Sequence, residues 1–544
     1  MCAQALNLWV FRENRRRLAG AQARCALLRE LEGLRAESSR ERVIRLLLRA
    51  GEMECGVADA ASAPLEPWAR LTDDLARALV SPGILLRPDQ LAGSLEFTEV
   101  PEQIEVSPPE GFAYYALHPL AYAEVLSKIP SLSDSVAVVG IRSIGTTLSA
   151  VVVAAARAEG KRAERNTVRP GGHPYNRLMT LSPQQAEFVR RHVAADSAFL
   201  VVDEGPGLSG SSFLSVAEAL ERAGVARERI VLIGSHLPNV DDLRAEDAPR
   251  RARRFCWIAV STEPRSPAQA GDFIGGGQWR THLFTHREDW PAAWITFERL
   301  KYFSCADKKL FKFIGLGHYG QEVLTRERQV TAAGFGPTPA READGFAWYP
   351  WIAGRSMMAN DLSPTVIERL AAYCAFRSKA FAASHAGIDT LQQMAEHNWA
   401  QTKNPQILRL RLERPAVVDG RMQPHEWLLT HSGEMLKTDS GAHGDDHFFP
   451  GPTDIAWDLA GAIVEWKMTP QQSRYFLERY RAESGDDATS RIGDFIAAYR
   501  AFRWAYCRMA ANALGGSEEQ VRLERAAGNY LGPVVAPAPE MLVS

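Results

Sequence analysis

The stretch FLVVDEGPGLSGSS, residues 199–212, decides the fold of the first half of the chain. It begins with a short apolar run, continues with two acids, and then places three glycines and three serines within eight residues. A short apolar run bounded by turn residues is typical of a strand buried on both faces of a parallel sheet. Ligands of such sheets bind beyond the carboxyl ends of the strands, and Asp203 and Glu204 stand at such an end.

The residues after the two acids predict a phosphate site. The turn Ser209–Ser212 offers backbone N–H groups and hydroxyls just before a predicted helix that starts at Phe213, and such a turn can hold a phosphate. The acids would repel the phosphate itself, but they can accept hydrogen bonds from hydroxyls one sugar length away. A phosphorylated ribose fits both features, because its phosphate can bind the turn while its hydroxyls donate hydrogen bonds to the two acids. The alternative is an ordinary strand-to-helix turn with a capping serine.

The neighbouring segments repeat the alternation of strand and helix. Apolar runs at 136–140 and 230–234 are rich in β-branched residues, and the segments 146–159 and 213–223 suit amphipathic helices. Strands that alternate with helices predict an α/β domain with a parallel sheet covered on both faces.

This region resembles the type I phosphoribosyltransferases, whose signature is an apolar strand, two acids, a spacer and a hydroxyl-rich turn. The resemblance implies Mg²⁺-dependent transfer from phosphoribosyl pyrophosphate to a small-molecule acceptor, with a mobile loop at 169–177. The implied catalytic residues are Asp203, Glu204 and Arg142, and the implied phosphate-binding residues are Ser209, Gly210, Ser211, Ser212, Gly145 and Thr146.

The second half contains a different glycine-rich stretch, KLFKFIGLGHYG, at 309–320. Gly315, Gly317 and Gly320 have the GxGxxG spacing of a nicotinamide-dependent oxidoreductase. However, Lys312 interrupts a strand that such a fold buries on both faces, and no second strand ending in an acid follows at the usual distance. We therefore keep the dinucleotide site only as an alternative.

The segment better resembles the superfamily of aminoglycoside phosphotransferases and protein kinases. The resemblance implies that Lys312 holds the phosphates of ATP, that Glu327 is its ion-pair partner, and that Asp439 and Glu426 bind the metal.

Other segments fit the same family frame. The resemblance implies a glycine-rich hairpin at 274–284 and a strand with a hinge between two lobes at 345–354. A helix carrying Asp458 would follow the metal-binding Asp.

The expected catalytic loop departs from that family. When Pro424 is aligned with the loop proline, Arg421 stands at the position of the catalytic Asp and Glu426 at that of the metal-binding Asn. Phosphotransfer needs a carboxylate that orients or deprotonates the acceptor, and Arg421 cannot supply one. Asp419 or Asp445 could serve instead, or the domain only binds nucleotide or a partner.

The loop AHGDDHFFPG at 442–451 combines two histidines with two aspartates. Both residue types bind metals, but no fixed ligand spacing is met. An ordinary polar loop is the alternative.

The chain divides into three predicted parts. These are a helical N-terminal segment at 1–95, a phosphoribosyltransferase-like domain at 96–245 and a kinase-like domain at 255–525. Within the first part, the capping-box spacing of Ser38 and Glu41 predicts a helix that ends at Gly51.

Composition limits the class of partner. The net charge of −2 provides no field that attracts nucleic acid or anionic membrane. Seven dispersed cysteines without a CxxC pair predict the reduced thiols of a cytoplasmic protein, and we expect neither a signal peptide nor a membrane span. We expect phosphoribosyl transfer linked to ATP-dependent phosphotransfer or nucleotide binding. The alternative is a non-catalytic sensor of phosphoribosyl pyrophosphate or nucleotide.

Overall fold

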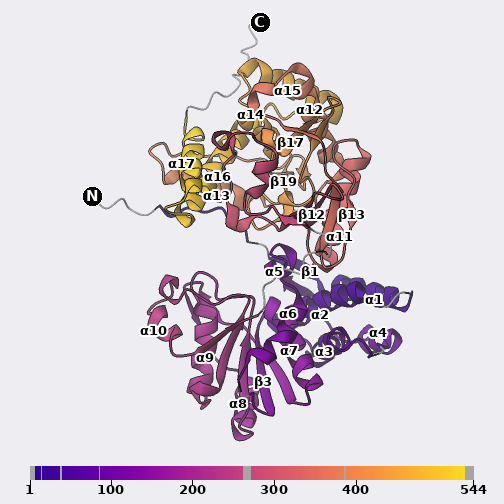
Figure 1. The fold of residues 1–544 in the computed structure, drawn as a ribbon, viewed down its shortest axis with the longest axis vertical. Coiled ribbons are helices and arrows are strands. Elements are labelled where there is room, and N and C mark those ends of the chain that lie inside the picture. The colour runs from indigo at the N-terminus through magenta and orange to yellow at the C-terminus, as the bar shows by residue number, and fades with distance from the viewer. Residues whose placement is uncertain are drawn as a thin grey trace.

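The computed structural model describes residues 6–13, 15–36, 39–84, 86–130, 132–260, 267, 271–384 and 387–532. Figure 1 shows two units: the lower one contains a parallel sheet with the N-terminal helices beside it, and the upper one is rich in helices. We call residues 15–260 the first unit, and residues 271–532 together with 6–12 the second unit. Among the described helices, none combines the length and hydrophobicity needed to cross a membrane.

The first unit is built on a five-stranded parallel sheet, which confirms the predicted α/β class. Its strand order is β4-β3-β7-β8-β9, and every neighbouring pair is parallel. The strands are β3 (Ser135–Ile141), β4 (Arg162–Val168), β7 (Ala198–Val202), β8 (Ile230–Gly234) and β9 (Cys256–Ala259). The order reverses between β3 and β7, and open sheets of this kind bind ligands outside the carboxyl ends of the strands at that reversal.

Helices cover both faces of this sheet. Helix α7 (Ile144–Ala158) packs on one face, and α8 (Pro183–Ala194) and α9 (Ser211–Arg222) cover the other. The strand side chains alternate, so Val138 joins the core cluster of α7 whereas Val139 joins that of α8 and α9. Both faces are therefore apolar, as the uninterrupted runs predicted.

The N-terminal segment is helical as predicted, but one predicted helix end is wrong. The helices are α1 (Gly20–Ala36), α2 (Arg40–Ala60), α3 (Glu66–Val80) and α4 (Pro88–Glu96). Ser38 lies outside the described residues. Gly51 does not end its helix: it lies inside α2, where a Cβ would clash with Thr147 Oγ1 of α7. The glycine therefore serves close helix packing.

The second unit begins with an antiparallel sheet of order β10-β11-β12-β14-β13. Its strands are β10 (Asp272–Phe273), β11 (Lys301–Ser304), β12 (Lys309–Phe313), β13 (Ala340–Arg341) and β14 (Phe346–Pro350), and α11 (Gly317–Ala332) follows β12. The sheet corrects two expectations. The GxGxxG turn follows an antiparallel strand and so is no dinucleotide site. The expected hairpin at 274–284 is a turn followed by a short 3-10 helix at Gln278–His282.

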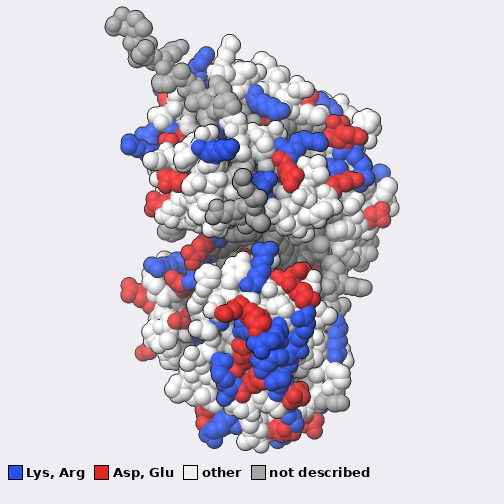
Figure 2. Space-filling view, turned by 90° about the vertical axis from the view of Figure 1, so that its left-hand side faces the viewer, with Lys and Arg blue, Asp and Glu red and all other residues white. Residues whose placement is uncertain are grey.

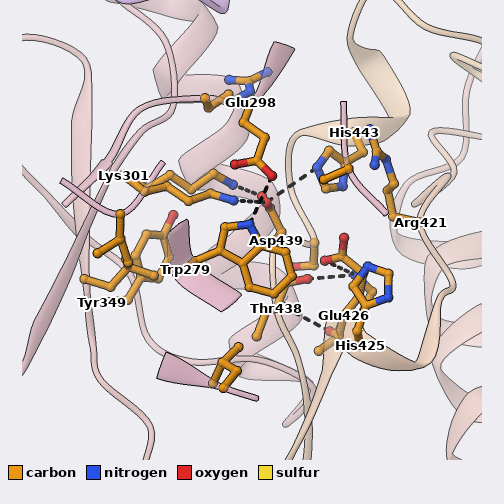
Figure 3. Close-up of a pocket in the computed structure, with 18 of the residues that line it drawn as sticks. Trp279, Glu298, Lys301, Tyr349, Arg421, His425, Glu426, Thr438, Asp439 and His443 are labelled. Atoms are coloured by element: carbon orange, nitrogen blue, oxygen red, sulfur yellow. Dashed lines mark hydrogen bonds and ion pairs between the residues drawn. The ribbon is translucent and has the colours of Figure 1, made fainter. Parts of the chain in front are cut away.

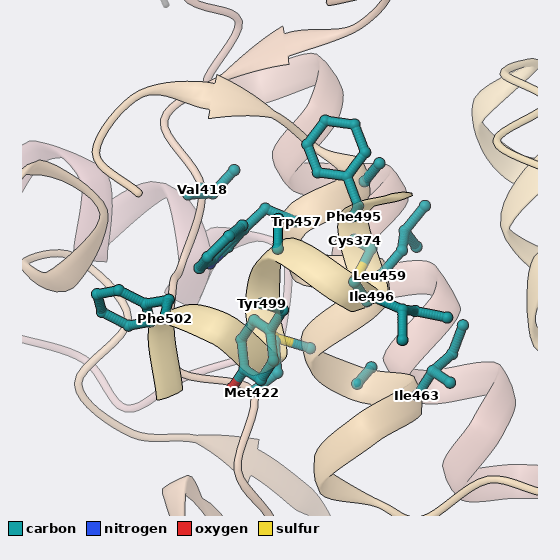
Figure 4. Packing of buried hydrophobic residues seen from close by; sticks show 14 of the residues in the cluster. Cys374, Val418, Met422, Trp457, Leu459, Ile463, Phe495, Ile496, Tyr499 and Phe502 are labelled. Atoms are coloured by element: carbon teal, nitrogen blue, oxygen red, sulfur yellow. The ribbon is translucent and has the colours of Figure 1, made fainter. Parts of the chain in front are cut away.

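The rest of the second unit is mainly helical. It contains α12 (Pro364–Ala380), α13 (Ile388–Ala400), α14 (Ala456–Glu465), α15 (Pro470–Ser484), α16 (Ile492–Ala513) and α17 (Glu518–Asn529). A hairpin of β17 (Trp427–Thr430) and β18 (Met435–Lys437) lies between the helices in sequence. Figure 4 shows Trp457 of α14 packed among Val418, Phe495, Tyr499 and Phe502, which fixes the loop before β17 against α14 and α16.

Two segments join the units. Residues 6–12 pack on the second unit, where Asn398 exchanges hydrogen bonds of 2.9 and 2.7 Å with the backbone of Trp9. The short helix α5 (Glu110–Ala113) lies at the junction, and Leu316 N donates to Phe112 O at 2.9 Å.

The surface near α9 and α10 (Ala248–Ala252) mixes charges of both signs. Figure 2 shows basic and acidic side chains interleaved on this side of the first unit. The interleaved charges include the ion pairs Arg251–Glu218 at 2.8 Å and Arg227–Glu221 at 2.7 Å. Because these arginines are paired with acids, their charges are balanced locally.

Candidate functional site

A cavity of about 200 Å³ lies between the antiparallel sheet and the helical part of the second unit (Figure 3). The sheet contributes Lys301 and Lys312, and the segment Tyr349–Ile352 lines the cavity where the chain leaves β14. Leu428 of β17 and Asp439, which follows β18, line it from the helical part. The described part of the chain thus encloses one space between two lobes.

The centre of the cavity is an ion-pair cluster. Lys312 is 3% exposed, and its ammonium contacts the carboxylate of Asp439. Lys301 Nζ lies 3.6 Å and His443 Nε2 3.5 Å from Asp439 Oδ2. Burial lowers the pKa of Lys312. Figure 3 shows Lys301 and His443 approaching Asp439 from opposite sides, with Arg421 beyond His443. Such a set of cations and one carboxylate can bind phosphate groups and a divalent cation.

Glu327 takes a different position from the one that the family resemblance implies. It lines the same cavity from α11, but it accepts a hydrogen bond from Tyr349 OH, and Lys312 pairs with Asp439 instead. Glu327 still attracts the Lys312 charge, which opposes the lowering of its pKa by burial.

Buried charged side chains hold the loop before β17, which contains Asp419 and Gly420. Asp458 of α14 accepts the backbone N–H groups of Asp419 at 2.7 Å and Gly420 at 2.9 Å. Asp419 is 1% exposed and is bound by Tyr373 OH and, at 3.3 Å, by Lys437 Nζ. It does not line the cavity, so Asp419 is a structural group rather than the replacement base that the sequence allowed. Arg421 does line the cavity.

Of the two aspartates in the 442–451 loop, both named as possible metal ligands, Asp446 lines the cavity and Asp445, the predicted alternative base, does not. Asp445 is held by Arg12 and Arg16, each at 2.9 Å, and is not among the lining residues. Asp446 lines the cavity beside Arg421, and burial raises its pKa to about 6. The signal was the run HGDD, but sequence could not decide which of its two acids faces inward.

The acidic residues of the cavity show whether it can bind the Mg²⁺ that the family resemblance implies. Within the described ranges, no group of three or more His, Cys, Asp or Glu side chains gathers as a metal cage. Asp439 and Glu426 both line the cavity, although Glu426 also lies 3.9 Å from Lys437. Mg²⁺ in phosphotransfer sites is usually held by one or two carboxylates together with substrate phosphates and water. The two acids therefore fit Mg²⁺ bound with a nucleotide, and not a metal held by protein alone.

The predicted acids of the first unit lie at the reversal of strand order. Asp203 and Glu204 follow β7, and the backbone of Asp203 packs close to Gly145 in the first turn of α7. Gly111 N donates to Glu204 Oε2 at 2.9 Å. Burial raises the pKa of Asp203 to about 7 and that of Glu204 to about 8. Carboxyls with pKa values shifted this far are enriched at functional sites.

Several of the predicted phosphate-binding residues are covered by other parts of the chain or buried. Ser209 and Ser211 both donate to Pro174 O, at 2.9 and 2.6 Å, so the tip of the 169–177 hairpin covers the turn. Arg142 Nη1 pairs with Asp59 at 3.0 Å, and Thr146 is buried. The structure thus brings the acids, the serine turn and Gly145 to one edge of the sheet, while Arg142 is bound elsewhere.

No protein-family model and no curated protein matches the chain. Solved structures do resemble its C-terminal part. Choline kinase LicA from Streptococcus pneumoniae is 12% identical over 43% of this chain and 90% of its own, with a TM-score of 0.32. A choline/ethanolamine kinase family protein from Mesorhizobium loti is 16% identical over 43% and 86%, with a TM-score of 0.28.

A third likeness is to an aminoglycoside 2′-phosphotransferase-IIIa solved with GDP. It is 14% identical over 46% of this chain and 98% of its own, with a TM-score of 0.28. Because these scores are low, we base the function proposed below on the side chains of the cavity.

Proposed function

We propose that the second unit is a nucleotide-dependent phosphotransferase that acts on a small molecule. The observation that carries this proposal is the contact between Lys312 and Asp439 inside a cavity that the connecting segment Tyr349–Ile352 also lines. A buried lysine–aspartate pair costs desolvation energy and is weak support for stability alone. The pair is better explained as machinery for a phosphate and its metal ion.

Each lining residue then has a chemical role. Lys312 and Lys301 neutralise the nucleotide phosphates, and Asp439 with Glu426 would hold Mg²⁺, which neutralises charge on the transferred group. The acceptor hydroxyl attacks the γ-phosphorus, the bond to the bridging oxygen breaks, and the nucleoside diphosphate leaves. Asp446 is the carboxylate that would take the hydroxyl proton.

Substitution of Lys312 by alanine tests nucleotide binding. We expect the affinity for ATP with Mg²⁺, measured by isothermal titration calorimetry, to fall about 10- to 100-fold, because a hydrogen bond to a charged group contributes about 1.5–3 kcal/mol. Lys309→Ala is the matched control, since Lys309 is on the same strand but does not line the cavity. Equal losses in both variants, or no ATP binding by the unmodified protein, would contradict the proposal.

A second function, phosphoribosyl transfer by the first unit, is favoured by the position of Asp203 and Glu204 beyond β7 at the reversal of strand order. In this reaction the acceptor attacks the anomeric carbon of phosphoribosyl pyrophosphate, and pyrophosphate leaves with the bonding electrons. The two acids would bind the ribose hydroxyls, and the serine turn would bind the 5-phosphate once Pro174 moves away from it.

The variant Asp203→Asn/Glu204→Gln should lose pyrophosphate release and gain stability. Burial raises the two pKa values to about 7 and about 8, so the folded state keeps protons that the unfolded chain releases near pH 4–5. Stability of the unmodified protein therefore falls as pH rises from about 4.5 to about 8, and the amides escape that loss. We expect the variant to be about 1–3 kcal/mol more stable at pH 8 and less so at pH 5, by urea denaturation.

The activity assay uses labelled phosphoribosyl pyrophosphate with a metabolite pool as acceptor. Loss of stability in the amide variant would assign the acids a structural role. Binding of phosphoribosyl pyrophosphate or ATP with no turnover of either would favour the alternative that the protein is a non-catalytic sensor of these ligands.

A further inference from the structure

We propose that the aromatic end of the cavity binds a small-molecule phosphate monoester as the acceptor of the phosphotransferase. This inference rests on the function proposed for the second unit. We call the site the acceptor end and define it by Tyr114, Trp294, Arg299, Arg421, Asp446 and Tyr506, all of which line the cavity.

Two guanidinium groups give the acceptor end its charge. Arg299 Nη1 donates to two backbone carbonyls, Ala113 O at 3.3 Å and Ile314 O at 3.1 Å. Arg421 lies over the ring of Tyr506, with its Cζ 5.5 Å from the ring centroid. In the described part of the chain, neither arginine has a carboxylate within ion-pair distance, whereas Lys301, Lys312 and Lys437 all do.

Unpaired cations that line a cavity favour an anionic ligand. A guanidinium carries five N–H donors, and the two hydrogen bonds of Arg299 go to neutral carbonyls. Asp446 attracts both guanidinium groups from beyond ion-pair distance. Two such groups at one end of a cavity match the geometry of a phosphate, which arginine binds in bidentate fashion. Both arginines are half-buried, and a charge partly removed from water is stabilised by an anion close to it, so binding of a dianion would be favourable.

The same arginines argue against a quaternary ammonium ligand. Aromatic rings alone attract such cations through their faces. Here Arg299 lies over Tyr114, at 5.2 Å from the ring centroid, and Arg421 lies over Tyr506. The faces of these two tyrosine rings are therefore occupied by positive charge, which would repel a ligand cation.

Asp446 specifies the rest of the ligand. A carboxylate at the same end can accept the proton of a hydroxyl, so the acceptor carries a phosphate and a free hydroxyl, as a sugar phosphate does. The neighbouring unit supplies a physical link. Gly111 N bonds Glu204, and Tyr114, three residues further on, lines the acceptor end. A phosphorylated sugar derivative formed in the first unit belongs to the class that the acceptor end would take.

Titration with ribose 5-phosphate tests the site without any need for turnover. The protein is the full chain with Asp203→Asn and Glu204→Gln, so that the first unit does not bind the probe. We expect ribose 5-phosphate to bind, and ribose, choline and inorganic phosphate to bind at least tenfold more weakly. Arg421→Met should weaken the binding of ribose 5-phosphate about 10- to 100-fold, Arg421→Lys should weaken it less, and the affinity for ADP with Mg²⁺ should stay unchanged.

Four outcomes would overturn the proposal: no binding of ribose 5-phosphate, tighter binding of choline, equal binding of inorganic phosphate, or no effect of Arg421→Met. Arg299→Met provides the same test if the Arg421 variant does not fold. Failure of the phosphotransferase proposal would be seen separately, as absence of ADP binding with ribose 5-phosphate binding retained.

Discussion

Replacement of Asp446 by asparagine should lower phosphotransfer by about 10²–10⁴-fold and leave nucleotide binding unchanged, because proton transfer by a positioned side chain contributes this much to a rate. Asp446 is 9% exposed and lines the cavity beside Arg421. Asparagine has nearly the same shape but cannot accept a proton. The measurement is ADP release from ATP in the presence of ribose 5-phosphate.

The dependence of the phosphotransfer rate on pH is an independent test of Asp446 as the general base. Burial raises the pKa of Asp446 to about 6, and the nearby Arg421 opposes that rise. A general base acts in its deprotonated form, so the rate should climb as pH increases through about 6 and then level off. In the Asn variant this limb should be absent.

Asp445→Asn is the matched control for Asp446, since Asp445 is the adjacent acid but is held by Arg12 and Arg16. Its loss should reduce stability, because removing one partner of a largely buried ion pair leaves the other charge uncompensated. The rate per folded molecule should stay within about threefold, because Asp445 does not line the cavity. Equal rate losses in the two variants would remove Asp446 from the mechanism.

Sequence could predict the parallel sheet because its strands are continuous apolar runs, and burial on both faces demands that pattern. The core confirms it: Val138 and Val139 are both buried, on opposite faces. The helix end at Gly51 could not be predicted, because the reason for that glycine is the approach of α7, which is distant in sequence.

Part of the candidate site could also be predicted from the sequence, namely the residues that belong to local motifs. Lys312 and Asp439 were recognisable from local motifs, and they meet in one cavity. The position of Asp446 was not, since Asp445 and Asp446 are equivalent in sequence and differ in the structure by the pairing of Asp445 with Arg12 and Arg16. Arg12 comes from the start of the chain, so no local pattern could reveal the choice.

Asp458→Ala should destabilise the protein by about 3–5 kcal/mol, the usual result of removing one partner from a buried charged network. The carboxylate is fully buried, accepts two backbone N–H groups from Asp419 and Gly420, and lies 3.7 Å from Arg377 Nε. Alanine leaves both backbone N–H groups without this acceptor and removes a negative charge from beside Arg377. Asparagine keeps one acceptor oxygen, so we expect a smaller loss of about 1–3 kcal/mol.

The same substitution should also weaken the acceptor end, because the loop that Asp458 anchors continues directly into Arg421. Urea denaturation at pH 7.5 measures the free energy of unfolding, and titration with ribose 5-phosphate in mild conditions measures the site. Asp389→Ala, which removes an exposed acid in the first turn of α13, should change stability by less than about 1 kcal/mol. If Asp458→Ala were as stable as that control, the network would not be what holds the loop, and the placement of Arg421 would need another cause.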